Sequence, residues 1–141
     1  MNTLQFLTRQ EIFDRAVGHL FTQSRAAHVA RGASTYRGYC GGCPVGSLIR
    51  PIDYVTAIDG VPVRYVSRNV ESVPTYMVNG VSALKRALLR ARVNVYDPVT
   101  VDLLSCLQNV HDMSGKWEWT ESLNSIARQF QLSADRVKSA A

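Results

Sequence analysis

The sequence predicts an α+β protein, a single domain dominated by helices with one small antiparallel β element. Two observations lead to this class. Four stretches carry apolar residues at helical spacing, and residues 54–66 carry β-branched residues on both sides of an Asp-Gly pair. The chain has 141 residues, of which 46% are hydrophobic, and this suits one globular domain over residues 1–141.

The first helix is predicted over residues 9–24. Thr8 and Glu11 have the spacing of a capping box, in which the hydroxyl and the carboxylate each satisfy a backbone amide. Apolar residues then recur at helical spacing, namely Ile12, Phe13, Ala16, Val17, Leu20 and Phe21. The next segment is rich in glycine, serine, threonine and tyrosine, and a short strand is predicted near residues 34–39.

The β element is predicted as a hairpin. Residues 54–58 and 61–66 flank Asp59-Gly60, and an Asp-Gly pair tolerates the positive φ angles of a tight hairpin turn. Pro62 cannot donate a ladder hydrogen bond, so its strand should lie at an edge.

Three further helices are predicted. The first runs over residues 82–91 behind a capping serine. The second starts with Asp97 as its cap and Pro98 at its first helical position. The third runs over residues 116–131, and Ser133 caps a short final turn.

The net charge of +5 is unevenly spread, because no acidic residue occurs between residues 15 and 52 or between 72 and 96. Thirteen of the sixteen basic residues are arginine, which pairs well with carboxylate or phosphate. An anionic partner is therefore predicted, and the candidate residues are Arg37, Lys85, Arg86, Arg90 and Arg92. The alternative is a solvated basic face without a partner.

Several classes of protein are not supported by the sequence. No apolar run approaches the ~20 residues of a membrane span, and the first residues do not read as a secretory signal, so we expect a cytoplasmic protein. There is no Ser/His/Asp constellation, no P-loop and no G-x-G-x-x-G. We therefore expect a non-catalytic protein without a cofactor.

The pair Cys40-Gly-Gly-Cys43 has three interpretations. It has the spacing of a zinc knuckle, which His19, His28 and either Cys106 or His111 could help to complete. It also has the spacing of a redox pair, although no βαβ pattern surrounds it. The third and preferred interpretation is structural: the glycines make a tight turn, and Cys43 caps a short helix that starts at Pro44.

Residues 126–139 resemble a DNA-binding helix-turn-helix. Ser133 would cap the second helix, and the candidate contacts to nucleic acid are Arg128, Ser133, Arg136 and Lys138. Gln131 stands where this motif usually has glycine. The preferred interpretation is a C-terminal helix followed by a capped final turn, because a groove reader needs several phosphate and base contacts.

Three separated pieces of the chain together resemble a group of small proteins encoded by bacteriophages and prophages. The pieces are Tyr36-Arg37-Gly38 with Cys43-x-x-Gly46-x-Leu48-Ile49, then Leu107-Gln108-x-x-His111-Asp112, then the segment from Ile126-Ala127 to Leu132. The resemblance implies a phage or prophage origin and carries over no catalytic residue. Cys40 does not belong to the pattern, and Pro44 stands where the group usually has alanine, which weakens the case for a shared zinc site.

The leading hypothesis is a small phage or prophage accessory protein that binds a protein partner. That partner would belong to the host or to the virion, which places the protein in the host cytoplasm or in the phage particle. One alternative is a DNA-binding module that uses residues 126–139. The other is a zinc- or thiol-dependent protein that uses Cys40 and Cys43.

Overall fold

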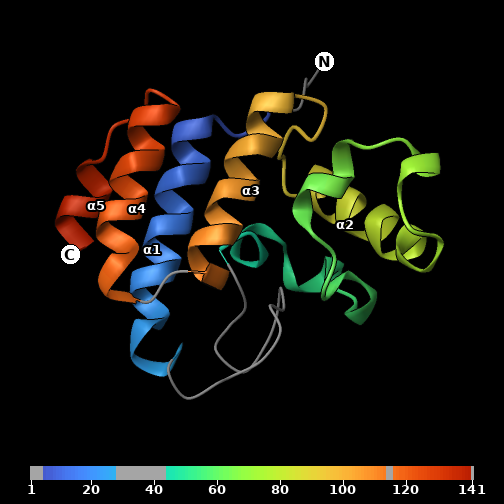
Figure 1. Ribbon diagram of the computed structural model, residues 1–141, viewed down its shortest axis with the longest axis horizontal. Helices are drawn as coiled ribbons and strands as arrows, with labels where there is room; N and C mark the ends of the chain where they lie inside the picture. The colour runs from blue at the N-terminus through green and yellow to red at the C-terminus, as the bar shows by residue number, and fades with distance from the viewer. Residues whose placement is uncertain (1–4, 28–43, 114–115, 141) are drawn as a thin grey trace.

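The computed structural model describes residues 5–27, 44–113 and 116–140 (Figure 1). These ranges contain five α-helices: α1 (Arg9–Ala27), α2 (Val78–Arg90), α3 (Pro98–Met113), α4 (Lys116–Gln129) and α5 (Asp135–Ala140). Short 3-10 helices occupy the region between α1 and α2: η1 (Gly46–Leu48), η2 (Pro51–Asp53), η3 (Thr56–Ile58), η4 (Val63–Ser67), η5 (Val70–Ser72) and η6 (Thr75–Met77). The described part of the chain holds no β-strand, so it is all-α.

Helices α1, α3, α4 and α5 lie side by side, and α4 runs antiparallel to α1 and α3 (Figure 1). Helix α2 lies on the opposite side of α3 from α1 (Figure 1), whereas η1 packs on α1. Helix α2 packs on η3, η4 and η6, while α3 packs on η4. The 3-10 region therefore joins α2 to the helical bundle.

Helix α1 starts as the sequence predicts. The Thr8 amide donates to Glu11 Oε1 over 2.9 Å, and the Glu11 amide donates to Thr8 Oγ1 over 3.0 Å. Both bonds of the capping box are thus confirmed. The helix buries one apolar face, made of Ile12, Phe13, Ala16, Val17 and Leu20. Those residues join a hydrophobic cluster to which α2, α3, α4, α5 and the 3-10 region all contribute.

The predicted hairpin over residues 54–66 is wrong, and with it the α+β class. Residues 56–58 and 63–67 are the 3-10 helices η3 and η4. Val63 and Val66 are both buried, and their spacing of three residues matches one turn of a 3-10 helix. These residues are covered by α2 and α3, so apolar burial does not require a partner strand.

The Asp-Gly pair makes a turn of a different type from the one a hairpin needs. Asp59 has φ −61° and ψ 135°, Gly60 has φ +83°, and the Val61 amide donates to the Ile58 carbonyl over 3.1 Å. These are the angles of a type II turn, whereas the common hairpin turn requires positive φ at both central residues. The turn is therefore present, but it redirects the chain between two 3-10 helices.

Helix α2 begins earlier than its predicted start at Ser82. The chain runs from η6 into α2 at Val78, and Met77 occupies the cap position without a side-chain hydrogen bond. Ser82 lies inside the helix and is exposed. Tertiary packing on η3 and η6 thus starts this helix where no capping side chain marks it.

The predicted starts of α3 and α5 are confirmed. Asp97 accepts hydrogen bonds from the Val99 amide (3.3 Å) and from the Thr100 hydroxyl (2.7 Å), and Pro98 is the first residue of α3. The Asp135 amide donates to Ser133 Oγ over 3.2 Å, so Ser133 does cap the final helix. Helix α4 ends at Gln129, two residues before its predicted end.

Three sequence predictions lie outside the described residues: the strand near residues 34–39, the turn at Cys40 and the cap at Cys43. The described chain resumes at Pro44 with a turn and continues into η1. None of the helices that the structure describes has the length and apolar character needed to cross a membrane.

Candidate functional site

Helix α2 separates apolar and basic residues onto two faces. Its buried face packs against the core and contains Val81, Leu84, Ala87 and Leu88. Arg86 and Arg90 are exposed on the opposite side, four residues apart, so they lie on the same helical face. The helical pattern seen in the sequence therefore holds for this pair.

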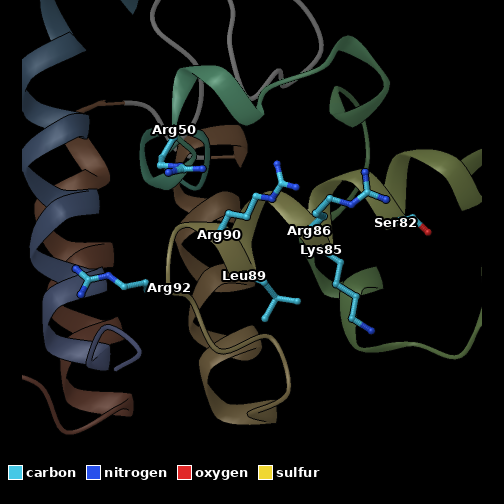
Figure 2. A pocket seen from close by; sticks show the side chains of 7 residues that line it. All are labelled: Arg50, Ser82, Lys85, Arg86, Leu89, Arg90 and Arg92. Atoms are coloured by element: carbon cyan, nitrogen blue, oxygen red, sulfur yellow. The ribbon is translucent and has the colours of Figure 1, made fainter. Parts of the chain in front are cut away.

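The exposed side of α2 forms an open groove of about 640 Å³. Its lining, here called the α2 basic face, comprises Arg50, Ser82, Lys85, Arg86, Leu89, Arg90 and Arg92. Arg86 and Arg90 point to one side of α2, whereas Lys85 and Leu89 point to another (Figure 2). Arg50 joins the face from the residue before η2. The structure thus gathers four of the five predicted anion-binding residues, and Arg37 lies outside the described residues.

Asp53 holds two of these arginines. Arg50 Nε donates to Asp53 Oδ2 over 2.7 Å, and Arg90 Nη1 donates to Asp53 Oδ1 over 3.0 Å. The side chain of Asp53 is only 3% exposed, whereas the arginine side chains are 55% and 57% exposed. The hydrogen bond from Arg50, followed by that from Arg90, lowers the pKa of Asp53. Asp53 therefore stays ionised and offsets part of the positive charge at Arg50 and Arg90.

The remaining three cations of the face are not held by a carboxylate. Lys85 Nζ lies 5.1 Å from the centroid of the Tyr96 ring, a cation–π contact that leaves the lysine charge uncompensated. Among the residues that the structure describes, Arg86 and Arg92 form no ion pair. The charge of Arg92 also acts on Glu11, whose pKa is lowered by hydrogen bonds from Thr8 and then by the charges of Arg15 and Arg92. Lys85 and Arg86 therefore provide most of the positive charge that an external anion would meet.

Arg92 occupies a backbone conformation that normally belongs to glycine. Its φ is +66°, and it follows Ala91, the C-cap residue of α2. The Arg92 amide donates to the Leu89 carbonyl (3.0 Å), and the Val93 amide donates to the Leu88 carbonyl (2.9 Å). This pair of bonds is the Schellman motif, whose left-handed residue is most often glycine because a Cβ is strained there. Arg92 therefore lines the groove in a strained backbone conformation.

Replacing Arg92 with glycine should raise the free energy of unfolding by about 1 kcal/mol, because glycine removes the left-handed strain. Chemical denaturation followed by circular dichroism measures this change. Gln131 is a matched control: its φ is +58°, and it ends α4 in the same motif. Gln131→Gly should stabilise the protein by a similar amount, and a loss of stability in both variants would contradict the assignment of strain.

The second candidate segment, residues 126–139, forms the end of α4, a turn and α5. Gln131 adopts the left-handed conformation that glycine usually supplies at this point of a helix-turn-helix. Gln10 of α1 holds the turn, since its Nε2 donates to the Ser133 carbonyl (3.0 Å) and its Oε1 accepts from the Ser133 amide (2.8 Å). The segment is therefore fastened to α1.

The basic residues of this segment are dispersed. Arg128 is exposed on α4, and Lys138 is exposed on α5. Ser133, in the turn between these helices, is hydrogen-bonded to Gln10 and to the Asp135 amide. The Arg136 guanidinium lies close to Gly18 of α1. A Cβ placed on Gly18 would be 2.9 Å from Arg136 Nη2. Val137 is fully buried, and α5 has six residues. The segment thus presents one outward cation on α4, Arg128, and one on α5, Lys138, and α5 is a short helix packed on the bundle.

The predicted metal ligands are not placed by the structure. Cys40 and Cys43 lie outside the described residues, and the side chain of His111 is likewise not described. Among the described residues there is no group of three or more His, Cys, Asp or Glu that could hold a metal ion. Cys106 is half-buried on α3, where burial, and then the charge of Asp102, raises the pKa of its thiol. A zinc site at Cys40 and Cys43 remains a prediction.

One cation of the α2 basic face, Arg50, and its carboxylate partner Asp53 were absent from the sequence-based candidates. The sequence contains a local signal for the pairing of Arg50 with Asp53. The two residues are three positions apart with Pro51 between them, which suits one turn of a 3-10 helix. The pairing of Asp53 with Arg90, 37 residues further along, has no such local signal.

Comparisons with protein-family models, with curated proteins and with solved structures found no match. The α2 basic face is therefore defined by its own geometry. It combines an amphipathic helix, a groove and three cations that form no ion pair in the described residues, one of which, Arg92, has a left-handed backbone.

Proposed function

We propose that the protein is a non-catalytic binding protein, an accessory protein of a bacteriophage or prophage, that recognises an acidic surface of a protein partner through the α2 basic face. The partner would be a host protein in the cytoplasm or a component of the virion. The resemblance to phage-encoded proteins supports the origin, and the α2 basic face supports the mode of binding.

The observation that carries this proposal is the way Asp53 sits between two arginines of the same face. Each of its oxygens receives one guanidinium hydrogen bond, at 2.7 Å from Arg50 and at 3.0 Å from Arg90. A carboxylate is thus a ligand that these side chains already accept. Arg86 lies one helical turn from Arg90 and has no ion pair in the described part of the chain, so it can receive a carboxylate from outside.

An acidic protein surface fits this face better than a nucleic acid. The face combines its cations with the apolar side chain of Leu89, and exposed Tyr96 lies against Lys85. Mixed apolar and charged contacts are typical of protein interfaces. A nucleic-acid site would need a longer track of cations for successive phosphates, and Asp53 would repel them.

The experiment measures binding of the protein to two labelled probes at several salt concentrations: a synthetic peptide with glutamates one helical turn apart, and a short DNA duplex. We expect the peptide to bind more tightly than the duplex. Arg86→Ala should weaken peptide binding about fivefold, because a charge-assisted hydrogen bond is lost. Arg92→Gly should also weaken it, since that cation leaves the groove.

Arg128→Ala is the matched control, because it removes the same charge from α4, on the far side of the bundle from α2 (Figure 1). It should leave peptide binding unchanged. Duplex binding that exceeds peptide binding and that is lost in Arg128→Ala would instead support the helix-turn-helix alternative. A peptide affinity that Arg86→Ala leaves untouched would refute the proposed role of the α2 basic face.

A further inference from the structure

Asp53 is the one acidic side chain that pairs with the α2 basic face in the described residues, and its position is unusual for an acid on a binding surface. Its side chain is 3% exposed although both of its arginine partners are more than half exposed. It therefore lies beneath the guanidinium groups and contributes a fixed negative charge to the base of the face.

Both oxygens of Asp53 are used. Oδ2 accepts from Arg50 and Oδ1 accepts from Arg90, so the carboxylate also ties η2 to the last turn of α2. These two arginines are thereby turned toward an internal anion. The cations that form no ion pair in the described residues are Lys85 and Arg86 of α2 and Arg92 after its end, and their side chains point in different directions (Figure 2).

The position of Asp53 should affect the binding of protein carboxylates and of DNA phosphates differently. A protein partner offers separated single carboxylates, each of which can meet one of these three cations while it stays away from Asp53. A DNA duplex carries one negative charge per about 1.7 Å of its axis, so phosphates laid along α2 would also approach Asp53. Like charges at close range repel strongly near low-dielectric protein.

We propose that Asp53 is a specificity-determining residue of the α2 basic face. It pairs with Arg50 and Arg90 and repels the closely spaced phosphates of a nucleic acid, so that the face binds the separated carboxylates of an acidic protein. This inference rests on the proposed function and adds the reason for its selectivity.

The experiment uses the full-length protein, the same glutamate peptide and the same DNA duplex. Asp53→Asn should raise duplex affinity about tenfold at low salt and steepen the dependence of log K on log salt by about 2, because Arg50 and Arg90 become available to phosphates. Peptide affinity should rise less than threefold, so the preference for peptide over duplex falls.

Glu121→Gln is the control, since it removes the same negative charge from an exposed position on α4, and it should leave the preference unchanged. Asp53→Ser should reproduce the effect of Asp53→Asn, and a thermal melt of each variant verifies its folding. If the wild type prefers the peptide and both folded Asp53 variants keep that preference, the role of Asp53 is refuted while the proposed function stands. If the wild type does not bind the peptide, both proposals fall.

Discussion

Replacing Gly80 with alanine should lower the free energy of unfolding by about 2 kcal/mol, because the cost of overpacking exceeds the gain in helix propensity. Gly80 lies in the first turns of α2, and a Cβ there would be 2.4 Å from the carbonyl oxygen of Ala57 and 2.8 Å from Val61 Cγ2. The first of these neighbours is backbone, so η3 or α2 itself must move. Alanine would otherwise be the better helix former by about 1 kcal/mol.

Gly18 provides the matched comparison within the same chain. It too lies inside a helix, and a Cβ there would be 2.9 Å from Arg136 Nη2, the end of a long and adaptable side chain. Gly18→Ala should therefore leave stability unchanged or raise it by up to about 1 kcal/mol. Urea denaturation followed by circular dichroism measures both variants. Equal effects at the two positions would show that the close packing of α2 on η3 does not limit stability.

The Gly80 variant also bears on function. A displacement of α2 from η3 would shift Arg86 and Arg90 relative to Arg50, which belongs to the 3-10 region. We expect Gly80→Ala to weaken binding of the glutamate peptide even under conditions where the variant remains folded. Gly18→Ala should leave peptide binding intact.

Replacing Gln108 with methionine should destabilise the protein by about 2 kcal/mol, because a buried backbone amide loses its acceptor. Gln108 is one of two buried polar residues in the described part of the chain, and its Oε1 accepts from the Val63 amide over 3.0 Å. Methionine has a similar shape but cannot supply the acceptor. The bond joins α3 to the first residue of η4, so its loss loosens the 3-10 region from the bundle.

Asn109→Met is the control for the Gln108 variant. Asn109 is the next residue of α3 and is exposed, so the change should alter stability by less than about 0.5 kcal/mol. Hydrogen exchange at the Val63 amide offers a second measurement, and it should accelerate in Gln108→Met. Unchanged stability and exchange would mean that another group, or water, satisfies this amide. Gln108 belongs to the Leu107-Gln108-x-x-His111-Asp112 piece of the phage-like pattern, and this hydrogen bond gives that position a structural role.

The helices with local signals were predicted correctly, because their start depends on neighbouring residues. Thr8 and Glu11 complete the cap of α1 within four residues, and Asp97 caps α3 with the next three. The start of α2 had no such signal, since packing on η3 and η6 replaces a side-chain cap. Its predicted start at Ser82 was therefore late.

The hairpin was predicted wrongly because two structures share its local features. An Asp-Gly pair between β-branched residues suits a hairpin turn and a type II turn alike. Which of the two turns forms depends on how Val63 and Val66 are buried. Both pack beneath α2 and α3, and this favours the type II turn between 3-10 helices. Helices α2 and α3 follow in the chain, so the residues of the turn alone did not contain that information.

The candidate site also combines features that the sequence predicted with features that depend on tertiary contacts. The spacing of Arg86 and Arg90 placed them on one helical face from the sequence, because that relation depends only on the helical repeat. The role of Asp53 depends on Arg90, 37 residues away, and the left-handed conformation of Arg92 depends on how α2 ends. The sequence by itself determined the helices with local caps and the basic side of α2. The tertiary structure alone decided the 3-10 region and the pairing of Asp53 with two arginines, because both depend on contacts between residues that are distant in the chain.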